Sequence, residues 1–209
     1  MRKKMIIMSF LSVSAVGFQM PILAAESASS TNTASFNLVS PKESLTIVAD
    51  DLSFRTSTIT ANDLVTTSST NLKINIQEIS GNAPGWSLTA QLGDFVNSDS
   101  SKVIKGTQLF YPNVTPTTTT IGDTSSIQPK SVGMEKAFSD GVSEGQVING
   151  GGDPVTIADA AKGTGYGSWT FNYAMDSVEL KIPAGNLADA YTANLTYTLA
   201  DKPTTAGAS

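Results

Sequence analysis

Short runs in which every second residue is apolar are the feature that most constrains the fold of this chain. Residues 71–79 place Leu72, Ile74 and Ile76 on one face, with mostly polar side chains between them. Alternation with a period of two gives a β-strand one buried face and one solvated face. The same kind of pattern predicts strands over residues 44–49, 52–58, 71–79, 85–92, 107–111, 167–175, 177–183 and 191–200.

The positions between the apolar residues are filled largely by small hydroxyl side chains. Serine and threonine account for 51 of the 209 residues, and this composition suits strand faces and turns better than helices. Glycine and proline separate the runs, as they do in antiparallel sandwiches and barrels. We therefore predict an all-β fold, an antiparallel two-sheet β-sandwich with long loops at residues 111–130 and 149–167. At most a short helix is expected, within residues 130–142.

The N-terminus has the three-part plan of a secretory signal peptide. A basic start is followed by an apolar run over residues 5–18 and by small residues at Ala24 and Ala25, where we expect cleavage. The apolar run is too short to span a bilayer, so no membrane span is expected after cleavage. The predicted organisation is a signal peptide at 1–25, a flexible polar leader at 26–35, a β domain at 36–203 and a polar tail at 204–209.

Removal of the signal peptide takes Arg2, Lys3 and Lys4 with it and leaves an acidic chain. The remaining 10 basic and 18 acidic residues give a net charge of −8. Nucleic acid selects for clusters of Lys and Arg, so nucleic acid is excluded as a partner. Cysteine is absent, so the domain has to be stabilised by its core instead of by disulfides. A secreted chain of this kind stays at a cell surface only by binding something there.

Histidine is also absent, which excludes Ser-His-Asp triads, cysteine nucleophiles and the usual zinc and iron sites. The clustered carboxylates, Asp50 with Asp51 and Asp94 with Asp99, fall at strand ends or in turns, where aspartate is common. Asn97 lies between the latter two, but the spacing is not that of a calcium loop. We therefore expect a non-enzymatic protein with no metal and no cofactor. An exported carbohydrate-active enzyme, with two carboxylates across a cleft, stays open as an alternative.

Two of the predicted strands carry large aromatic residues on their apolar face. The residues concerned are Trp86 and Leu88 in the first strand, and Tyr191, Leu195, Tyr197 and Leu199 in the second. Two interpretations are open at this point. The faces are the core sides of two central strands, or they line a groove that stacks on sugar rings or receives a partner. Trp169, the other tryptophan, is expected in the core.

These two strands resemble the two motifs of the WxL-domain family of surface proteins from low-GC Gram-positive bacteria. The family pairs a "GWxLTxQ"-like strand with a C-terminal motif "YxxxLxWxLxxxP". The chain has "GWSLTAQ" at residues 85–91 and "YTANLTYTLADKP" at residues 191–203, with Tyr197 where the family has its second tryptophan. The resemblance runs from Phe36 to Lys202 and covers nearly the whole mature chain.

The resemblance implies a secreted protein held non-covalently on the cell wall at the extracellular surface, with peptidoglycan as the ligand. It also implies that the motif residues form one binding feature on neighbouring strands and that other surface proteins are partners. Tyr197 retains an aromatic ring but lacks the indole donor of the family residue. The alternative is a structural or adhesive subunit that reaches the wall through a partner and contacts host or partner through its loops. An open edge strand would favour that alternative.

Overall fold

The computed structural model describes residues 36–39, 41, 44–119 and 124–202. The expected signal peptide, the 26–35 leader and the 204–209 tail lie outside these residues. Within them, no helix has the length and apolar character needed to cross a bilayer.

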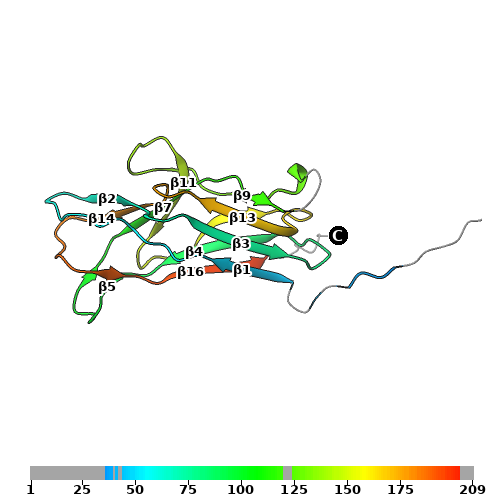
Figure 1. Ribbon diagram of the computed structural model, residues 1–209, viewed down its shortest axis with the longest axis horizontal. Helices are drawn as coiled ribbons and strands as arrows, with labels where there is room; N and C mark the ends of the chain where they lie inside the picture. The colour runs from blue at the N-terminus through cyan, green and yellow to red at the C-terminus, as the bar shows by residue number, and fades with distance from the viewer. Residues whose placement is uncertain (1–35, 40, 42–43, 120–123, 203–209) are drawn as a thin grey trace, which may run out of the picture. The chain divides into compact units, whose positions relative to one another are not determined.

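Regular structure in the described residues is almost entirely β-strand in antiparallel sheets, which confirms the all-β prediction (Figure 1). The β3 sheet has the order β1 (Leu45–Ala49), β3 (Leu72–Glu78), β13 (Gly167–Tyr173) and β8 (Thr117–Thr118). The β4 sheet has the order β16 (Leu195–Asp201), β4 (Trp86–Leu92), β12 (Val155–Ala160) and β9 (Lys130–Ser131).

Two further sheets complete the fold. The β7 sheet has the order β10 (Glu135–Lys136), β11 (Glu144–Asn149), β7 (Gln108–Pro112), β14 (Glu179–Ile182) and β2 (Leu64–Thr67). The small β5 sheet has the order β15 (Tyr191–Thr192), β5 (Phe95–Asn97) and β6 (Val103–Ile104).

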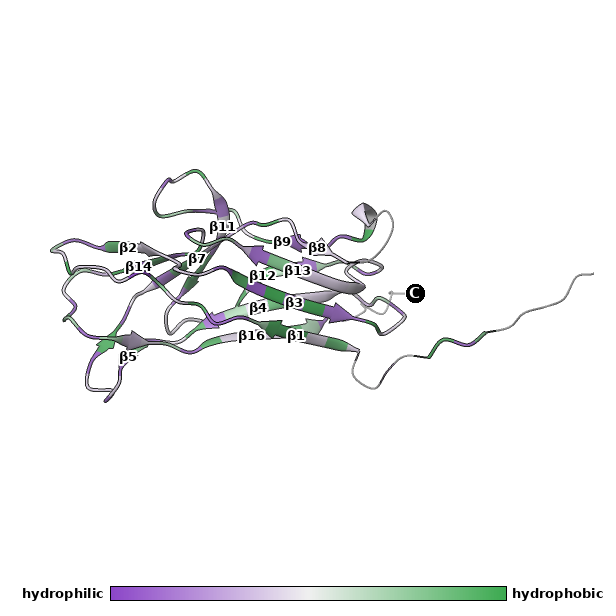
Figure 2. Cartoon of the chain, in the orientation of Figure 1, coloured by the Kyte–Doolittle hydropathy of each residue, from purple (hydrophilic) through white to green (hydrophobic). Residues whose placement is uncertain are grey.

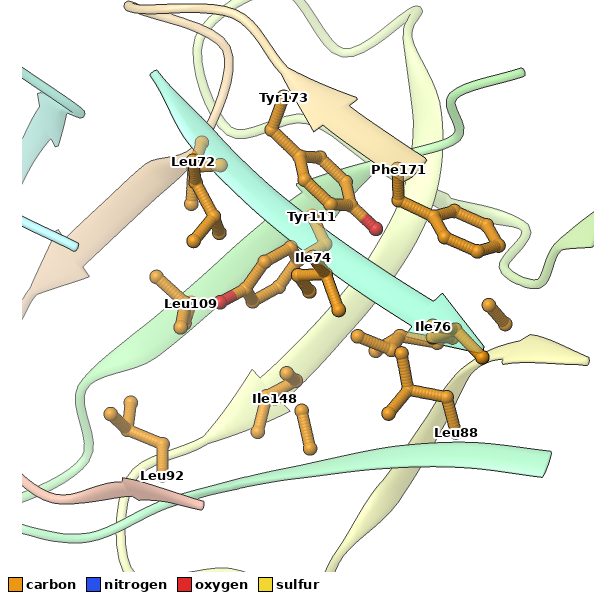
Figure 3. Packing of buried hydrophobic residues seen from close by; sticks show 14 of the residues in the cluster. Leu72, Ile74, Ile76, Leu88, Leu92, Leu109, Tyr111, Ile148, Phe171 and Tyr173 are labelled. Atoms are coloured by element: carbon orange, nitrogen blue, oxygen red, sulfur yellow. The ribbon is translucent and has the colours of Figure 1, made fainter. Parts of the chain in front are cut away.

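The core forms where the β3 sheet faces the β4 sheet. Along β3, buried and exposed residues alternate without interruption, so Leu72, Ile74 and Ile76 all point inward as their spacing predicts. They meet Leu88 of β4 in the same interior (Figure 3). The hydropathy colouring shows β1, at the edge of the β3 sheet, as largely hydrophobic (Figure 2). This two-sheet packing is consistent with a β-sandwich.

The β7 sheet extends this core. Tyr111 of β7 is almost fully buried, and its ring meets that of Tyr173 on β13 edge to face, with centroids 5.2 Å apart and an interplanar angle of 80° (Figure 3). Such edge contacts between aromatic rings stabilise a core beyond the area they bury. The tyrosines therefore connect the β7 sheet to the β3 sheet through side chains.

Two local predictions are wrong, for residues 52–58 and 149–167, and the short helix allowed within residues 130–142 does not form. Residues 52–58 form no strand and make only one bridge, between Phe54 and Ser68, although Leu52 and Phe54 pack against the core. Residues 130–142 form β9, β10 and a turn instead of a helix, and the helical turn that the structure describes is the 3-10 turn at Ser125–Ile127. Residues 149–167 are not one loop, because they contain β12, a neighbour of β4.

The alternation of apolar residues does not predict strand β12, and the reason is physical. Its register against β4 shifts between Thr156 and Ala158, which marks a β-bulge. A bulge inserts one extra residue and so interrupts the period of two. Ile157 and Ala158 are consequently both buried although they are adjacent. The alternation test fails for a strand that is nonetheless central to its sheet.

Candidate functional site

The two motif strands lie side by side, as the resemblance implied. Strand β16 pairs antiparallel with β4 along its whole length, from Leu195 opposite Leu92 to Asp201 opposite Trp86. Tyr197 lies opposite Ala90, and Leu199 lies opposite Leu88. Strands β4 and β16 thus form one continuous patch of sheet, although 102 residues lie between Leu92 and Leu195 in the sequence.

Trp86 begins β4 and lies entirely inside the protein. Its side chain is 0 % exposed, and its ring meets Phe171 of the opposite sheet edge to face, with centroids 6.3 Å apart. The indole Nε1 donates a hydrogen bond of 3.0 Å to the carbonyl oxygen of Gly165. A buried indole N–H needs such a partner, and here the partner is the protein's own backbone. Trp86 is therefore unavailable for contact with a ligand in this structure.

The glycines around Trp86 allow this close packing. Gly85 and Gly165 have φ values of +81° and +71°, a region that side chains other than glycine rarely adopt. A Cβ at Gly165 would lie 2.6 Å from Trp86 Nε1, and one at Gly85 would lie 2.7 Å from the carbonyl oxygen of Ala160. The glycine in front of the first motif therefore has a structural role beside the tryptophan.

The second motif occupies a different environment, because β16 is the edge strand of its sheet. Leu195, Tyr197 and Leu199 are half-buried against the core, while Thr196 and Thr198 face solvent. The Tyr197 hydroxyl lies 2.7 Å from the hydroxyl of Tyr111. Burial raises the pKa of Tyr197 to about 12, and the hydrogen bond from Tyr111 offsets part of that rise.

Tyr191 starts the second motif on the short strand β15, which pairs with β5 and not with β4. Its side chain is half-buried, and its hydroxyl donates a hydrogen bond of 2.8 Å to the carbonyl oxygen of Leu187. The predicted strand over residues 191–200 is therefore divided between two sheets. Tyr191 is also one of the residues that line a groove.

This groove has a volume of about 1320 Å³. It is lined mainly by residues 49–59, here called the strap, and by residues 186–195, here called the return segment, together with side chains of the central strands. Its apolar lining includes Leu52, Phe54, Phe95, Leu187, Tyr191, Leu195 and Tyr197. Trp86, Leu88 and Leu199 do not line it. Large, mostly apolar depressions with a few polar groups are typical of ligand sites.

Ion pairs hold both walls of the groove. Arg55 of the strap forms a bidentate ion pair with Asp176, in which Nε donates to Oδ1 at 2.7 Å and Nη2 donates to Oδ2 at 2.9 Å. This hydrogen bonding lowers the pKa of Asp176. Asp189 of the return segment pairs with Lys102 at 2.6 Å, and the hydrogen bond from Lys102 lowers the pKa of Asp189. The charges of Arg55 and Asp189 are thereby compensated outside the groove.

The remaining charges at the groove are negative. Asp50 accepts a hydrogen bond from the backbone N–H of Lys73 at 3.2 Å. Within the part of the chain that the structure describes, neither Asp50 nor Asp51 forms an ion pair, and both are exposed. An anionic ligand would be repelled there, whereas a neutral or cationic one would be tolerated.

The other residues considered from the sequence have structural environments. Trp169 is 1 % exposed and donates from Nε1 to the carbonyl oxygen of Tyr166 at 2.9 Å, which confirms its place in the core. Asn97 and Asp99 accept hydrogen bonds from the backbone of their own turn. Among the residues that the structure describes, no three acidic, histidine or cysteine side chains are grouped to hold a metal.

The strap and residues 186–190 of the return segment were not identified as site residues from the sequence, whereas Tyr191 and Leu195 of the return segment were. The strap was predicted as a strand because Leu52 and Phe54 alternate with polar residues. Residues 186–190 have no regular pattern. The available signal was Leu187, an apolar residue in a stretch without strand alternation.

The sequence of this chain was compared with protein families, curated proteins and solved structures. A family model described as the WxL domain, surface cell wall-binding, matches residues 25–203. Comparisons with curated proteins and with solved structures gave no match. The family match covers both motif strands, the strap and the return segment, and so accounts for most of the chain. The chain therefore belongs to the WxL family of cell-wall-binding surface domains.

Proposed function

We propose that this chain is exported, after removal of its signal peptide, and is held non-covalently on peptidoglycan by the groove between the strap and the return segment. It acts as a non-enzymatic binding module. Membership of a cell-wall-binding surface family supplies the general activity. The observation that carries the finer proposal is that Tyr191, Leu195 and Tyr197, three residues of the second motif, line one groove.

The groove has the properties that a wall polymer requires. Tyrosine combines apolar area with a hydrogen-bonding edge, so Tyr191 and Tyr197 can contact a sugar face or a peptide while staying partly solvated. Two separate chain segments line the groove, and a residue of each segment forms an ion pair with a residue outside the groove. Walls that are held in place before the ligand arrives lower the entropy cost of binding.

The proposal is tested by co-sedimentation of the purified chain, from Glu26 onward, with peptidoglycan stripped of proteins and secondary polymers. Saturable pelleting is expected for the wild type. Tyr191→Ala should weaken it by about tenfold, because an aromatic anchor in a groove carries a large share of the binding energy. A folded wild-type chain that stays in the supernatant would overturn direct attachment.

Tyr166→Ala is the matched control. Tyr166 is 44 % exposed and lies outside the groove lining, so the variant removes an accessible tyrosine ring of the same size elsewhere. We expect its pelleting to stay within about twofold of wild type. Equal losses in Tyr191→Ala and Tyr166→Ala would place the contact outside the groove.

A second candidate is a structural or adhesive subunit that reaches the wall through another surface protein. One observation favours it: β16 is an edge strand whose outward side chains, Thr196, Thr198 and Ala200, are uncharged. Uncharged edges accept an added strand from a partner. Pelleting with intact walls but not with stripped peptidoglycan would support this route. The double variant Thr196→Lys, Thr198→Lys should then abolish that pelleting.

A further inference from the structure

Two tyrosine hydroxyls share one hydrogen bond, and one of the two residues, Tyr197, lines the groove. Tyr111 Oη and Tyr197 Oη are 2.7 Å apart. Tyr111 is 2 % exposed and does not line the groove, whereas Tyr197 is half-buried and does. Among the described residues, neither hydroxyl has another hydrogen-bond partner within bonding distance. The two hydroxyls therefore carry two protons, of which only one is used in a hydrogen bond within the protein.

Burial decides which hydroxyl donates. The proton of a buried hydroxyl must be satisfied inside the protein, because an unmade bond costs the full desolvation of the group. Tyr111 has no other acceptor in the described structure, so Tyr111 donates and Tyr197 accepts. Burial raises the pKa of both hydroxyls, so both stay protonated at neutral pH. The proton of Tyr197 then stays free for a ligand.

We infer that Tyr197 donates this hydrogen bond to an amide carbonyl of the ligand, and so selects neutral, amide-bearing segments of the wall polymer. The inference rests on the proposed function. Carboxylate and phosphate acceptors are disfavoured, because Asp50 and Asp51 leave the groove with uncompensated negative charge. Among neutral acceptors, a carbonyl oxygen accepts without bringing a proton of its own, whereas a sugar hydroxyl would bring one that the apolar side chains beside Tyr197 leave unpaired.

The donor also explains how a tyrosine serves at a position where the resembling family has tryptophan. An indole N–H donates only, and a tyrosine hydroxyl alone both donates and accepts. With Tyr111 donating to it, the Tyr197 hydroxyl has one lone pair engaged and presents its proton outward. Tyr111 is therefore a positioning residue that turns Tyr197 into a donor.

The experiment compares pelleting of Tyr197→Phe with that of wild type on stripped peptidoglycan. Loss of the donor should raise the dissociation constant roughly fivefold, the usual range for one neutral hydrogen bond. Tyr173→Phe is the control, because it removes a buried hydroxyl from the same aromatic cluster outside the groove. Binding of Tyr197→Phe equal to wild type would overturn the inference. No pelleting of the folded wild type would instead refute the proposed function.

A second measurement does not depend on the variant being folded. Wild-type protein is mixed with peptidoglycan before and after chemical de-N-acetylation of its glycan. Weaker binding after the treatment identifies the acetamido carbonyl as the acceptor. Unchanged binding, together with the loss in Tyr197→Phe, identifies the amides of the stem peptide. If Tyr197→Phe does not fold, the 13C shift of the Tyr197 ring carbon that bears the hydroxyl is followed in wild type. Its movement on addition of muropeptide supports the inference, and an unchanged shift at saturation overturns it.

Discussion

The two WxL motifs differ in what surrounds their aromatic residues. Trp86 lies on β4, between two other strands of its sheet and beneath Phe171 of the opposite sheet, and is 0 % exposed. Tyr197 lies on β16, at the sheet edge, where it is half-buried and lines the groove. The two strands pair directly, yet one aromatic residue has only protein around it and the other borders accessible space.

This difference separates stability from binding within one patch of sheet. A central strand has neighbours on both sides and a sheet above it, so its apolar face has no route to a ligand. An edge strand has no hydrogen-bonded partner on its outer side, and Leu195 and Tyr197 of β16 line the groove together with the strap and the return segment. The first motif is expected to hold the fold, and the second to contact the ligand.

The largest effect is expected from Trp86→Ala. The variant leaves a cavity and orphans the carbonyl oxygen of Gly165, so the free energy of unfolding should fall by about 3–5 kcal/mol. Chemical denaturation measures it. A loss below about 1 kcal/mol would show that the tryptophan is not a core residue and would break the comparison. Binding assays on this variant need a melting curve, because unfolding also abolishes pelleting.

A smaller loss is expected from Gly165→Ala, which adds a methyl group against Trp86 at a positive φ. Strain and overpacking together should cost about 3 kcal/mol. Gly163→Ala is the matched control, because its φ of +83° is similar but no atom lies within 4 Å of the added Cβ. The control should lose only about 1–2 kcal/mol, by backbone strain alone. Equal losses in thermal unfolding would mean that contact with Trp86 is irrelevant.

The smallest effect concerns the second motif and alkaline pH. The pKa of Tyr197 is raised by burial to about 12 in the folded state, so the unfolded chain releases this proton first. The contribution is full below about pH 10 and is lost as pH rises through 12, about 2–3 kcal/mol in all. The free energy of unfolding is measured by urea at about pH 8 and about pH 11. Between these two pH values it should fall less for Tyr197→Phe than for wild type. An equal fall in the free energy of unfolding for the two proteins would show that Tyr197 is exposed to solvent.

Much of the fold follows from the period of two. The alternation in β3 and β4 marks which side chains turn away from water, and the structure buries those residues. The spacing within each motif likewise put its aromatics on the apolar face, and the register of β16 against β4 places Tyr197 on the same face as Trp86, while Tyr191 lies on β15. Local pattern suffices here because successive side chains of any strand must point to opposite faces.

Other elements depended on contacts that no local pattern records. The bulge in β12 breaks the alternation, and the strap shows alternation without a strand partner for most of its length. Sequence distance also hides that Tyr111, from β7, meets Tyr197 of β16. Each of these features exists only once distant strands have been brought together.

The sequence by itself determined the all-β class, the buried faces and the two motif strands. Only the tertiary structure decided that Trp86 belongs to the core and that Tyr191, Leu195 and Tyr197 border a groove. The physical reason is that alternation reports a face leaving bulk water. It does not report whether that face meets another sheet, as for β4, or the space between two loops, as for the edge strand β16.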